Sequence, residues 1–342
     1  MKAAVWDGSD ILKFDPDYPD PVCRDDWVVI KVMSAGICAT DLHIMRGEFG
    51  EPPLIMGHEI CGIITDIGSR VESCGVGDRV VVETAVSCGH CRYCESGQKH
   101  LCSECHEVGF PPHNGGYAQY VTAPANCIHR IPDSMSWDEG GVLEAALCPF
   151  GLICRYGVKP GETVLIQGTG VAGLSFLQSV KALGAGKVIV AARNPYRLEQ
   201  ALRFGADTAI NTKTENLYDR VMEETGGLGA DLSIDSAGAP VTIEQAVKLA
   251  APGGRCILYG LPDGDPDIHF PVKEIIMKQL TVMGGTNNQL AWDPLIELIA
   301  EGRFDVKSYV TGHCTLETVN EAVREVRAHP DHLIKTVIHP WE

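Results

Sequence analysis

The chain has 342 residues, of which 45% are hydrophobic, and its formal net charge at pH 7 is −17. A chain of this length is too long for one compact core, so two folded domains are predicted. The hydrophobic content excludes global disorder. The acidic charge argues against nucleic acid and against an anionic membrane surface as partners, because both attract surfaces rich in lysine and arginine.

Short β-like runs, interrupted by glycine and proline, characterise the first 150 residues. Strands are expected at residues 27–36, within 55–65 and at 78–83, which together predict a loop-rich β domain. Residues 1–14 contain one early lysine and no apolar run, so we expect neither a signal peptide nor a membrane anchor. The cytoplasm is the expected compartment, and 14 cysteines fit it if they are metal ligands or buried thiols.

Three residues of this half carry the donor atoms of a catalytic metal site. Cys38, His58 and Glu59 supply a thiolate, an imidazole and a carboxylate, and such a set binds zinc with one coordination position left open. Alone, a cysteine and a histidine 20 residues apart are more often core residues. Their interpretation as ligands therefore depends on two further motifs.

The first of these is the run CGHCRYCESGQKHLC, which contains Cys88, Cys91, Cys94 and Cys102. Closely spaced thiolates can converge on one tetrahedral ion, and zinc accepts an all-sulfur site. Cys105 could compete with Cys102 for the fourth position. We expect a structural zinc lobe over residues 84–106. Four protein ligands leave no open position, so the chemistry must lie elsewhere.

Beyond residue 162 the pattern changes to alternating strands and helices. Strands are expected at residues 163–168, 187–192, 207–211, 230–238, 254–260 and 280–285. Helices are expected at 173–184, 195–205, 217–225 and 242–250. This alternation predicts a doubly wound parallel sheet over residues 151–286. Two further helices, at 293–301 and 316–328, a strand near Tyr309 and a last strand at 334–340 should return to the β domain, which would then comprise 1–150 and 287–342.

The second motif is a glycine-rich loop between the first strand and helix of that sheet. In this position G-x-G-x-x-G is typical of a dinucleotide site, where the helix N-terminus receives a pyrophosphate. The loop residues expected to bind the cofactor are Gly168, Gly170, Val171, Ala172 and Gly173.

The end of the second strand should contact the adenosine ribose. An NAD site usually has an acidic residue there, but this chain has Ala192 and Arg193. A small residue leaves room for a 2′-phosphate, and Arg193, aided by Arg197, could pair with it. We therefore expect a preference for NADP, with NAD possible. A position of Arg193 against the adenine or in solvent is the alternative.

Taken together, residues 36–43 (GICATDLH), residues 57–59 (GHE), the cysteine run and the glycine loop resemble the zinc-dependent medium-chain dehydrogenase family over essentially the whole chain. The resemblance implies a GroES-like β-rich catalytic domain beside a Rossmann domain. It also implies two zinc ions per chain, with Cys38 and His58 as ligands of the catalytic ion. Thr40 and His43 would relay the substrate proton, and Asp41 would orient His58.

The identity of the remaining protein ligand of the catalytic zinc ion differs between subfamilies of these dehydrogenases. Liver-type alcohol dehydrogenases supply a cysteine, whereas polyol and threonine dehydrogenases supply a glutamate in a Glu-Pro motif. The matching stretch here is GGVLEAALCPFG, in which Glu144 occupies the expected place and Cys148 comes four residues too late. Ala145 replaces the proline. We expect Glu144 to be a ligand, with Glu59 able to exchange with it or with water.

The expected reaction is hydride transfer between NAD(P) and a secondary alcohol of the polyol, sugar or hydroxy-acid type, through a zinc-bound alkoxide. Two alternatives are a zinc-free quinone or enone reductase and a zinc-binding dinucleotide sensor without turnover. The substrate should lie near Thr40, Met45, Phe49, Phe110, Asn114, Glu144, Leu147 and Asn287. The apolar strand at 280–285 could pair with its copy, so a homodimer or homotetramer is expected.

Overall fold

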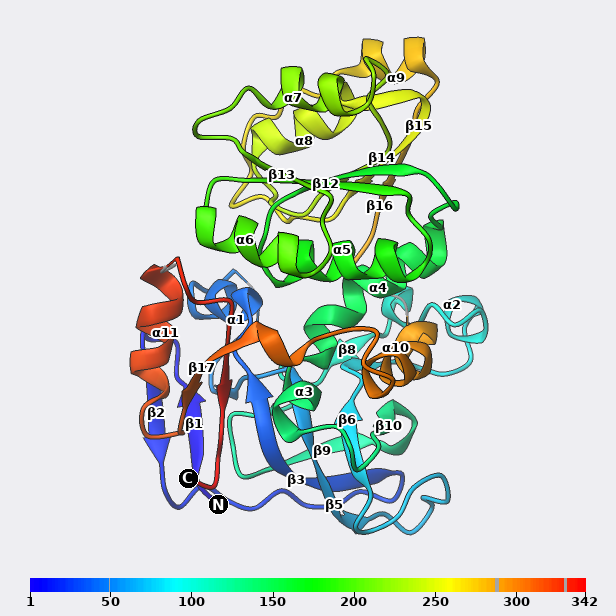
Figure 1. The fold of residues 1–342 in the computed structure, drawn as a ribbon. Helices are drawn as coiled ribbons and strands as arrows, with labels where there is room; N and C mark the ends of the chain where they lie inside the picture. Colours follow the sequence, from blue (N-terminus) through cyan, green and yellow to red (C-terminus); the bar gives the residue numbers. More distant parts are fainter. Residues whose placement is uncertain (49, 287–288, 329–330) are drawn as a thin grey trace. The chain divides into compact units, whose positions relative to one another are not determined.

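The computed structural model describes residues 1–48, 50–286, 289–328 and 331–342 (Figure 1). The chain forms two compact units, Met1–Ala145 with Asn288–Glu342, and Ala146–Asn287. The first division therefore follows residue 145 rather than 150, within helix α4 (Leu143–Tyr156). None of the helices in the described ranges combines the length and the apolar character that crossing a membrane requires.

The first unit is built on a seven-stranded sheet of order β10-β6-β5-β3-β18-β17, with β9 also paired to β3. These strands are β3 (Trp27–Gly36), β5 (Glu59–Ile67), β6 (Arg79–Val82), β9 (Tyr120–Pro124), β10 (Ile128–Arg130), β17 (Val310–Cys314) and β18 (Lys335–Ile338). A second sheet contains β1 (Ala3–Trp6), β2 (Leu12–Asp15) and β4 (Leu54–Ile55), and β7 (Ala85–Val86) pairs with β8 (His106–Glu107).

Strands β3 and β6 lie where the apolar runs predict them. The region 55–65 instead contains the end of one strand and the start of another, β4 and β5. Gly57 separates them with a φ of +94°, a conformation that disfavours side chains. A Cβ at Gly57 would also lie 2.4 Å from the ring of Tyr117, so the chain must turn there.

The C-terminal segment returns to this unit, as expected. It contributes α10 (Trp292–Ala300), β17, α11 (Val319–Ala328) and β18. Strand β18 pairs with the end of β3, with Val337 opposite Gly36. The last strand is thereby placed beside the segment that continues into Cys38. The other helices of the unit are α1 (Ala39–Met45), α2 (Arg92–Glu95) and α3 (Trp137–Gly141), with short 3₁₀ turns at Lys99–Leu101, Ala125–Cys127, Gln289–Ala291 and Lys307–Tyr309.

The second unit contains the expected six-stranded parallel sheet, in the order β13-β12-β11-β14-β15-β16. Its strands are β11 (Thr163–Gln167), β12 (Lys187–Ala192), β13 (Thr208–Asn211), β14 (Ala230–Asp235), β15 (Ala250–Leu258) and β16 (Thr281–Gly284). Helices α5 (Val171–Ala182) and α6 (Pro195–Arg203) cover one face, and α7 (Leu217–Glu224) and α8 (Pro240–Lys248) cover the other (Figure 1). This is the doubly wound order of a dinucleotide-binding fold, so the predicted fold class is confirmed.

Helices α4 and α9 (Val272–Lys278) are not among the expected elements, and neither are the short helices α1, α2 and α3. Helix α4 contains Pro149 in its interior, and proline removes a helical hydrogen bond and disfavours the preceding turn. Its apolar residues Leu143, Leu147 and Phe150 are nevertheless buried. Burial of this apolar face outweighs the local cost of the proline, which local sequence signals cannot show.

Candidate metal and dinucleotide sites

Cys38, His58 and Glu59 come together where β3 ends and β5 begins. The two strands are antiparallel with Gly36 opposite Glu59, so the residues that flank this pair are neighbours in space. One potential ligand atom from each of the three side chains lies within 4.8 Å of the others. A Cβ at Gly36 would lie 2.0 Å from Glu59 Oε2, so only glycine leaves room for that carboxylate.

Buried Asp41 lies beside His58. Asp41 accepts hydrogen bonds from the Tyr117 hydroxyl (2.6 Å) and the Cys38 backbone N–H (2.8 Å), and its other oxygen lies 3.6 Å from His58 Nδ1. This leaves Nε2 of His58 to face the cluster, the usual arrangement of a metal-bound histidine. Burial opposes a charge on His58, but the Cys38 sulfur and the Asp41 carboxylate outweigh it and raise the pKa of His58. The pocket therefore favours a cation.

Glu59 divides its two oxygens between a buried lysine and the cluster. Oε1 accepts a hydrogen bond from Lys335 of β18, and both side chains are almost completely buried. Oε2 is buried and has no hydrogen-bond partner among the residues that the structure describes. A buried carboxylate oxygen without a partner is costly, and a metal ion between Cys38, His58 and Glu59 would satisfy it. The donor set thus fits zinc.

Glu144 lies at the start of α4 and is not part of the group of ligand atoms within 4.8 Å. It is buried, and burial raises the pKa of its carboxyl to about 7. His58 lowers this pKa and Glu59 raises it, so Glu144 lies within electrostatic reach of both. The geometry brings Glu59, rather than Glu144, to Cys38 and His58.

Thr40 and His43 are three residues apart on α1 and so share a face of that helix. The Thr40 hydroxyl accepts from the Cys38 thiol at 3.5 Å. His43 Nδ1 lies 2.7 Å from both Glu48 and Arg46, and the ring is largely shielded from solvent. The expected relay residues thus begin beside the cluster and continue to a charged pair at the end of α1.

The residues expected to line the substrate differ in burial and in their contacts. Met45 is buried in the hydrophobic core, and Asn114 accepts a hydrogen bond from the Ile55 backbone N–H. Both side chains therefore contribute to packing or backbone hydrogen bonding in the first unit. The Phe110 ring lies 5.5 Å from the His58 ring, close enough to border a substrate on the metal side. Leu147 is buried in α4, and Phe49 and Asn287 lie outside the described residues.

In the cysteine lobe, Cys88, Cys91, Cys94 and Cys102 form a group with all four sulfurs within 4.8 Å of one another. Sulfur–sulfur distances of 3.8 Å (Cys88–Cys94), 3.5 Å (Cys91–Cys94) and 3.6 Å (Cys88–Cys102) are far too long for disulfides. They match the edge of a tetrahedron with zinc–sulfur bonds, about 3.8 Å. Cys105 lies outside the group, and its thiol donates to the His106 carbonyl.

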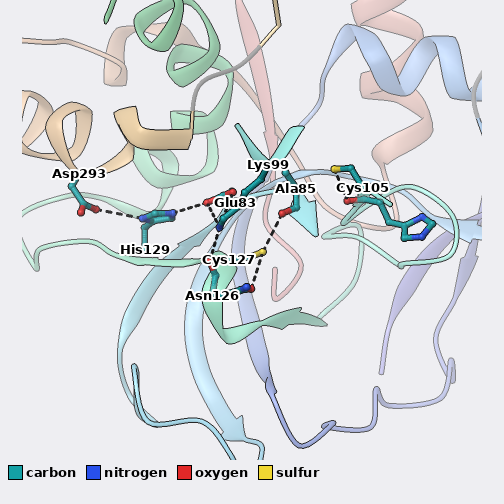
Figure 2. A network of polar contacts seen from close by, with 9 residues as sticks. Glu83, Ala85, Lys99, Cys105, Asn126, Cys127, His129 and Asp293 are labelled. Atoms are coloured by element: carbon teal, nitrogen blue, oxygen red, sulfur yellow. Dashed lines mark hydrogen bonds and ion pairs between the residues drawn. The ribbon is translucent and has the colours of Figure 1, made fainter. Parts of the chain in front are cut away.

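A charge network around the buried Glu83 ties this lobe to the β-sheet (Figure 2). Lys99, between Cys94 and Cys102 in the chain, donates to the Asn126 carbonyl at 3.1 Å and lies 3.2 Å from the buried carboxylate of Glu83. His129 Nε2 lies 3.1 Å from the same carboxylate, and its Nδ1 faces Asp293 of α10 at 3.4 Å. The lobe is thus anchored by charge as well as by its cysteines.

In the second unit the glycine loop has the geometry of a phosphate cradle. Gly168 has a φ of +109°, and a Cβ at Gly173 would lie 2.1 Å from the Gly168 carbonyl oxygen. These two glycines are required by the turn and by the packing of α5 on β11. A Cβ at Gly170 would meet nothing within 4 Å, so the space at the α5 N-terminus, next to Val171 and Ala172, is open to a pyrophosphate.

The end of β12 leaves Arg193 exposed. Ala192 is its last residue, and Asn194 caps α6 by accepting from the backbone N–H of Arg197. Among the described residues, none forms a hydrogen bond or ion pair with the guanidinium of Arg193. It is thus available to an anionic ligand. The side chain of Arg197 is half-buried one turn further on.

Two functional residues could not be found from local patterns. Tyr117 holds Asp41, and Lys335 holds Glu59, yet each comes from a segment far from the ligands in the chain. Lys335 is the one charged residue of the last strand, β18, and this charge is a signal that the sequence offers.

Comparison with known proteins places the chain in a family. Residues 24–133 match the alcohol dehydrogenase GroES-like domain, and residues 172–301 match the zinc-binding dehydrogenase domain. The chain belongs to the zinc-dependent medium-chain dehydrogenase family and is an oxidoreductase of the NAD(P)-dependent alcohol dehydrogenase class. The family resemblance is confirmed, and neither the zinc-free reductase nor the sensor is favoured.

Individual relatives cover nearly the whole chain. A sorbitol dehydrogenase of Bacillus subtilis is 33% identical over 99% of this chain and 97% of its own length. A probable D-xylulose reductase of Emericella nidulans is 31% identical over 98% and 95%. A crystal structure of an alcohol dehydrogenase from Escherichia coli with NADH has a TM-score of 0.92 and 29% identity, and the match covers 99% of each chain.

Proposed function

We propose that this protein interconverts a polyol and the corresponding ketose, with zinc in the Cys38 cluster and NADP as the preferred cofactor. The observation that carries the proposal is the convergence of Cys38, His58 and Glu59 beside the Thr40 hydroxyl. The sorbitol dehydrogenase and D-xylulose reductase among its full-length relatives support polyols as the substrate class.

The residues of the cluster have separate roles in this reaction. When bound, zinc supplies Lewis-acid polarisation of the substrate oxygen, and the nicotinamide accepts or donates the hydride. Cys38, His58 and Glu59 hold the metal, with Glu144 near enough to exchange with Glu59 after a side-chain movement. Thr40 accepts the substrate hydroxyl proton at Oγ1, and His43 passes it towards Glu48 and solvent.

NADP preference is the part of the proposal that rests on the second unit. Ala192 offers no carboxylate to a ribose 2′-hydroxyl, and the exposed guanidinium of Arg193 suits a 2′-phosphate. The four-cysteine lobe would hold a second, structural zinc ion. Fourteen free thiols support a reducing compartment such as the cytoplasm.

The test is a substrate screen with zinc-loaded protein. Sorbitol, xylitol, 2,3-butanediol and simple secondary alcohols are offered with NAD and with NADP, and formation of the reduced cofactor is measured by absorbance. We expect the highest kcat/KM for a polyol with NADP, and at least two zinc ions per chain by elemental analysis.

Thr40 provides the matched variants. Thr40→Val should lower kcat by about 10² or more, whereas Thr40→Ser retains the hydroxyl and should keep most of the activity. Zinc content should be unchanged in both. Turnover of no polyol by the zinc-loaded wild type, or equal kcat in Thr40→Val and wild type, would contradict the proposal.

A further inference from the structure

Asp138, His313 and His339 form a cluster in the first unit that neither zinc site includes. Asp138 lies on α3, His313 on β17, and His339 directly follows β18. One ligand atom of each lies within 4.8 Å of the others. The side chains are 27%, 51% and 21% exposed, so an ion could enter from solvent and keep water ligands.

Both imidazoles face the same carboxylate. His339 Nε2 lies 2.7 Å from Asp138 Oδ1, and His313 Nε2 lies 2.9 Å from Oδ2. The ring centroids are 5.1 Å apart. The buried Ser34 hydroxyl donates to Oδ1 at 3.3 Å and fixes that oxygen from behind. Two imidazoles and one carboxylate are a frequent donor set of transition-metal sites.

The outer ring nitrogen of His339 also has a carboxylate partner. Its second nitrogen, Nδ1, lies 3.1 Å from Glu342 Oε1, so each ring nitrogen faces a carboxylate. A metal-bound histidine typically contacts a carboxylate through its other nitrogen, as His339 does with Glu342.

We propose that Asp138, His313 and His339 bind a divalent transition metal, with zinc as the preferred occupant. Ligand atoms around such an ion at about 2.1 Å are separated by about 3.0–3.4 Å, so each imidazole nitrogen needs to move away from its carboxylate oxygen by only a few tenths of an ångström. The ion would tie α3 to the returning C-terminal segment. This site is independent of the proposed reaction.

The test is the metal content of the full-length protein after dialysis against micromolar free zinc. We expect the wild type to bind one zinc ion more per chain than the His313→Asn/His339→Gln double variant. The matched control is His332→Gln, which removes an exposed histidine that lies beside a single carboxylate, 3.6 Å from Glu325. Its zinc content should equal that of the wild type.

A second measurement uses only the wild-type protein, so it is independent of whether the double variant folds. Crystals of the wild type grown with zinc should give an anomalous difference peak, at the zinc absorption edge, between the two imidazoles and the Asp138 carboxylate. Absence of this peak, or equal zinc content in wild type and double variant, would show that protons alone occupy the cluster and would overturn the proposal.

Discussion

Lys335 is the only basic side chain that pairs with Glu59 among the described residues, and both groups are buried. The carboxylate raises the pKa of Lys335 even though burial opposes the charge. Removal of one partner of a buried ion pair leaves an uncompensated charge, which typically costs about 3–5 kcal/mol. The free energy of unfolding of the metal-free protein should thus fall by about 3 kcal/mol in Lys335→Met.

Urea unfolding measures this change. Lys2→Met is the control, because the ion pair of Lys2 with Glu317 is exposed at the surface and should contribute about 1 kcal/mol or less. Equal losses in the two variants would mean that the buried pair contributes no more than a surface pair.

Glu144 should make the stability of the metal-free protein depend on pH. Burial raises the pKa of its carboxyl from 4.5 to about 7, so the folded protein retains a proton that the unfolded chain releases. The resulting stabilisation is full below about pH 4.5 and is lost as the pH rises through about 7, by roughly 3 kcal/mol. Urea unfolding at about pH 5 and about pH 8 measures it.

In Glu144→Gln this part of the pH dependence should disappear, because glutamine does not titrate. Glu297→Gln, at an exposed position of α10, should retain the wild-type profile. A Glu144→Gln protein with the pH profile of the wild type would show that Glu144 has an ordinary pKa in the folded state.

Arg193→Ala tests the cofactor preference. Loss of a charge-assisted pair with a 2′-phosphate typically costs about 1.5–3 kcal/mol, so kcat/KM with NADP should fall about 10- to 100-fold, while kcat/KM with NAD changes little. Arg203→Ala, which removes an exposed arginine paired with Glu199 on α6, should affect neither cofactor. A wild type that strongly prefers NAD would contradict the assignment.

At the scale of elements, the cysteine lobe is held by its sulfurs and by the contacts of Lys99 with Glu83 and Asn126, and it contains little regular structure. Helix α2 has four residues and none of them is buried. A metal ion that closes such a lobe contributes directly to its folding. Cys91→Ser should therefore remove one zinc ion per chain and make residues 84–106 sensitive to limited proteolysis. Cys105→Ser should keep both properties of the wild type, since Cys105 lies outside the sulfur group. Zinc loss in Cys105→Ser would reverse this ligand assignment.

At the scale of the whole molecule, the described part of the six-stranded sheet ends at β16, which follows α9 in the chain. Backbone groups on the outer side of an edge strand invite pairing with another chain. Several large hydrophobic side chains on α9 and the segment that precedes it are exposed, namely Leu261, Phe270, Val272, Ile276 and Met277. A second copy of the chain that pairs along β16 would cover this surface.

We therefore expect a dimer or larger oligomer in light scattering, with dissociation in the Ile276→Asp/Met277→Asp double variant. Both side chains are exposed, so the changes should not disturb the fold of the subunit. Leu228→Asp, an equally exposed position in the loop that precedes β14, is the control. A monomeric wild type would refute the expectation.

The elements that could be predicted are those specified by short-range patterns. The strand and helix alternation after residue 162 and the glycine loop depend on residues within a few positions of one another. The spacing of the four cysteines likewise predicts a metal site without any tertiary information. Helix α4 could not be predicted, because Pro149 lowers the local propensity and only packing in the folded unit restores it.

By itself, the sequence determined the class of each motif, because donor type, glycine placement and apolar periodicity are local properties. Tertiary structure alone decided which distant side chains complete each site. Pairing of β18 with β3 brings Lys335 to Glu59, the fold at Gly57 brings Tyr117 to Asp41, and α3 brings Asp138 to the two C-terminal histidines. Charge balance within a buried site depends on contacts between distant segments, so it cannot be predicted from the spacing of residues along the chain.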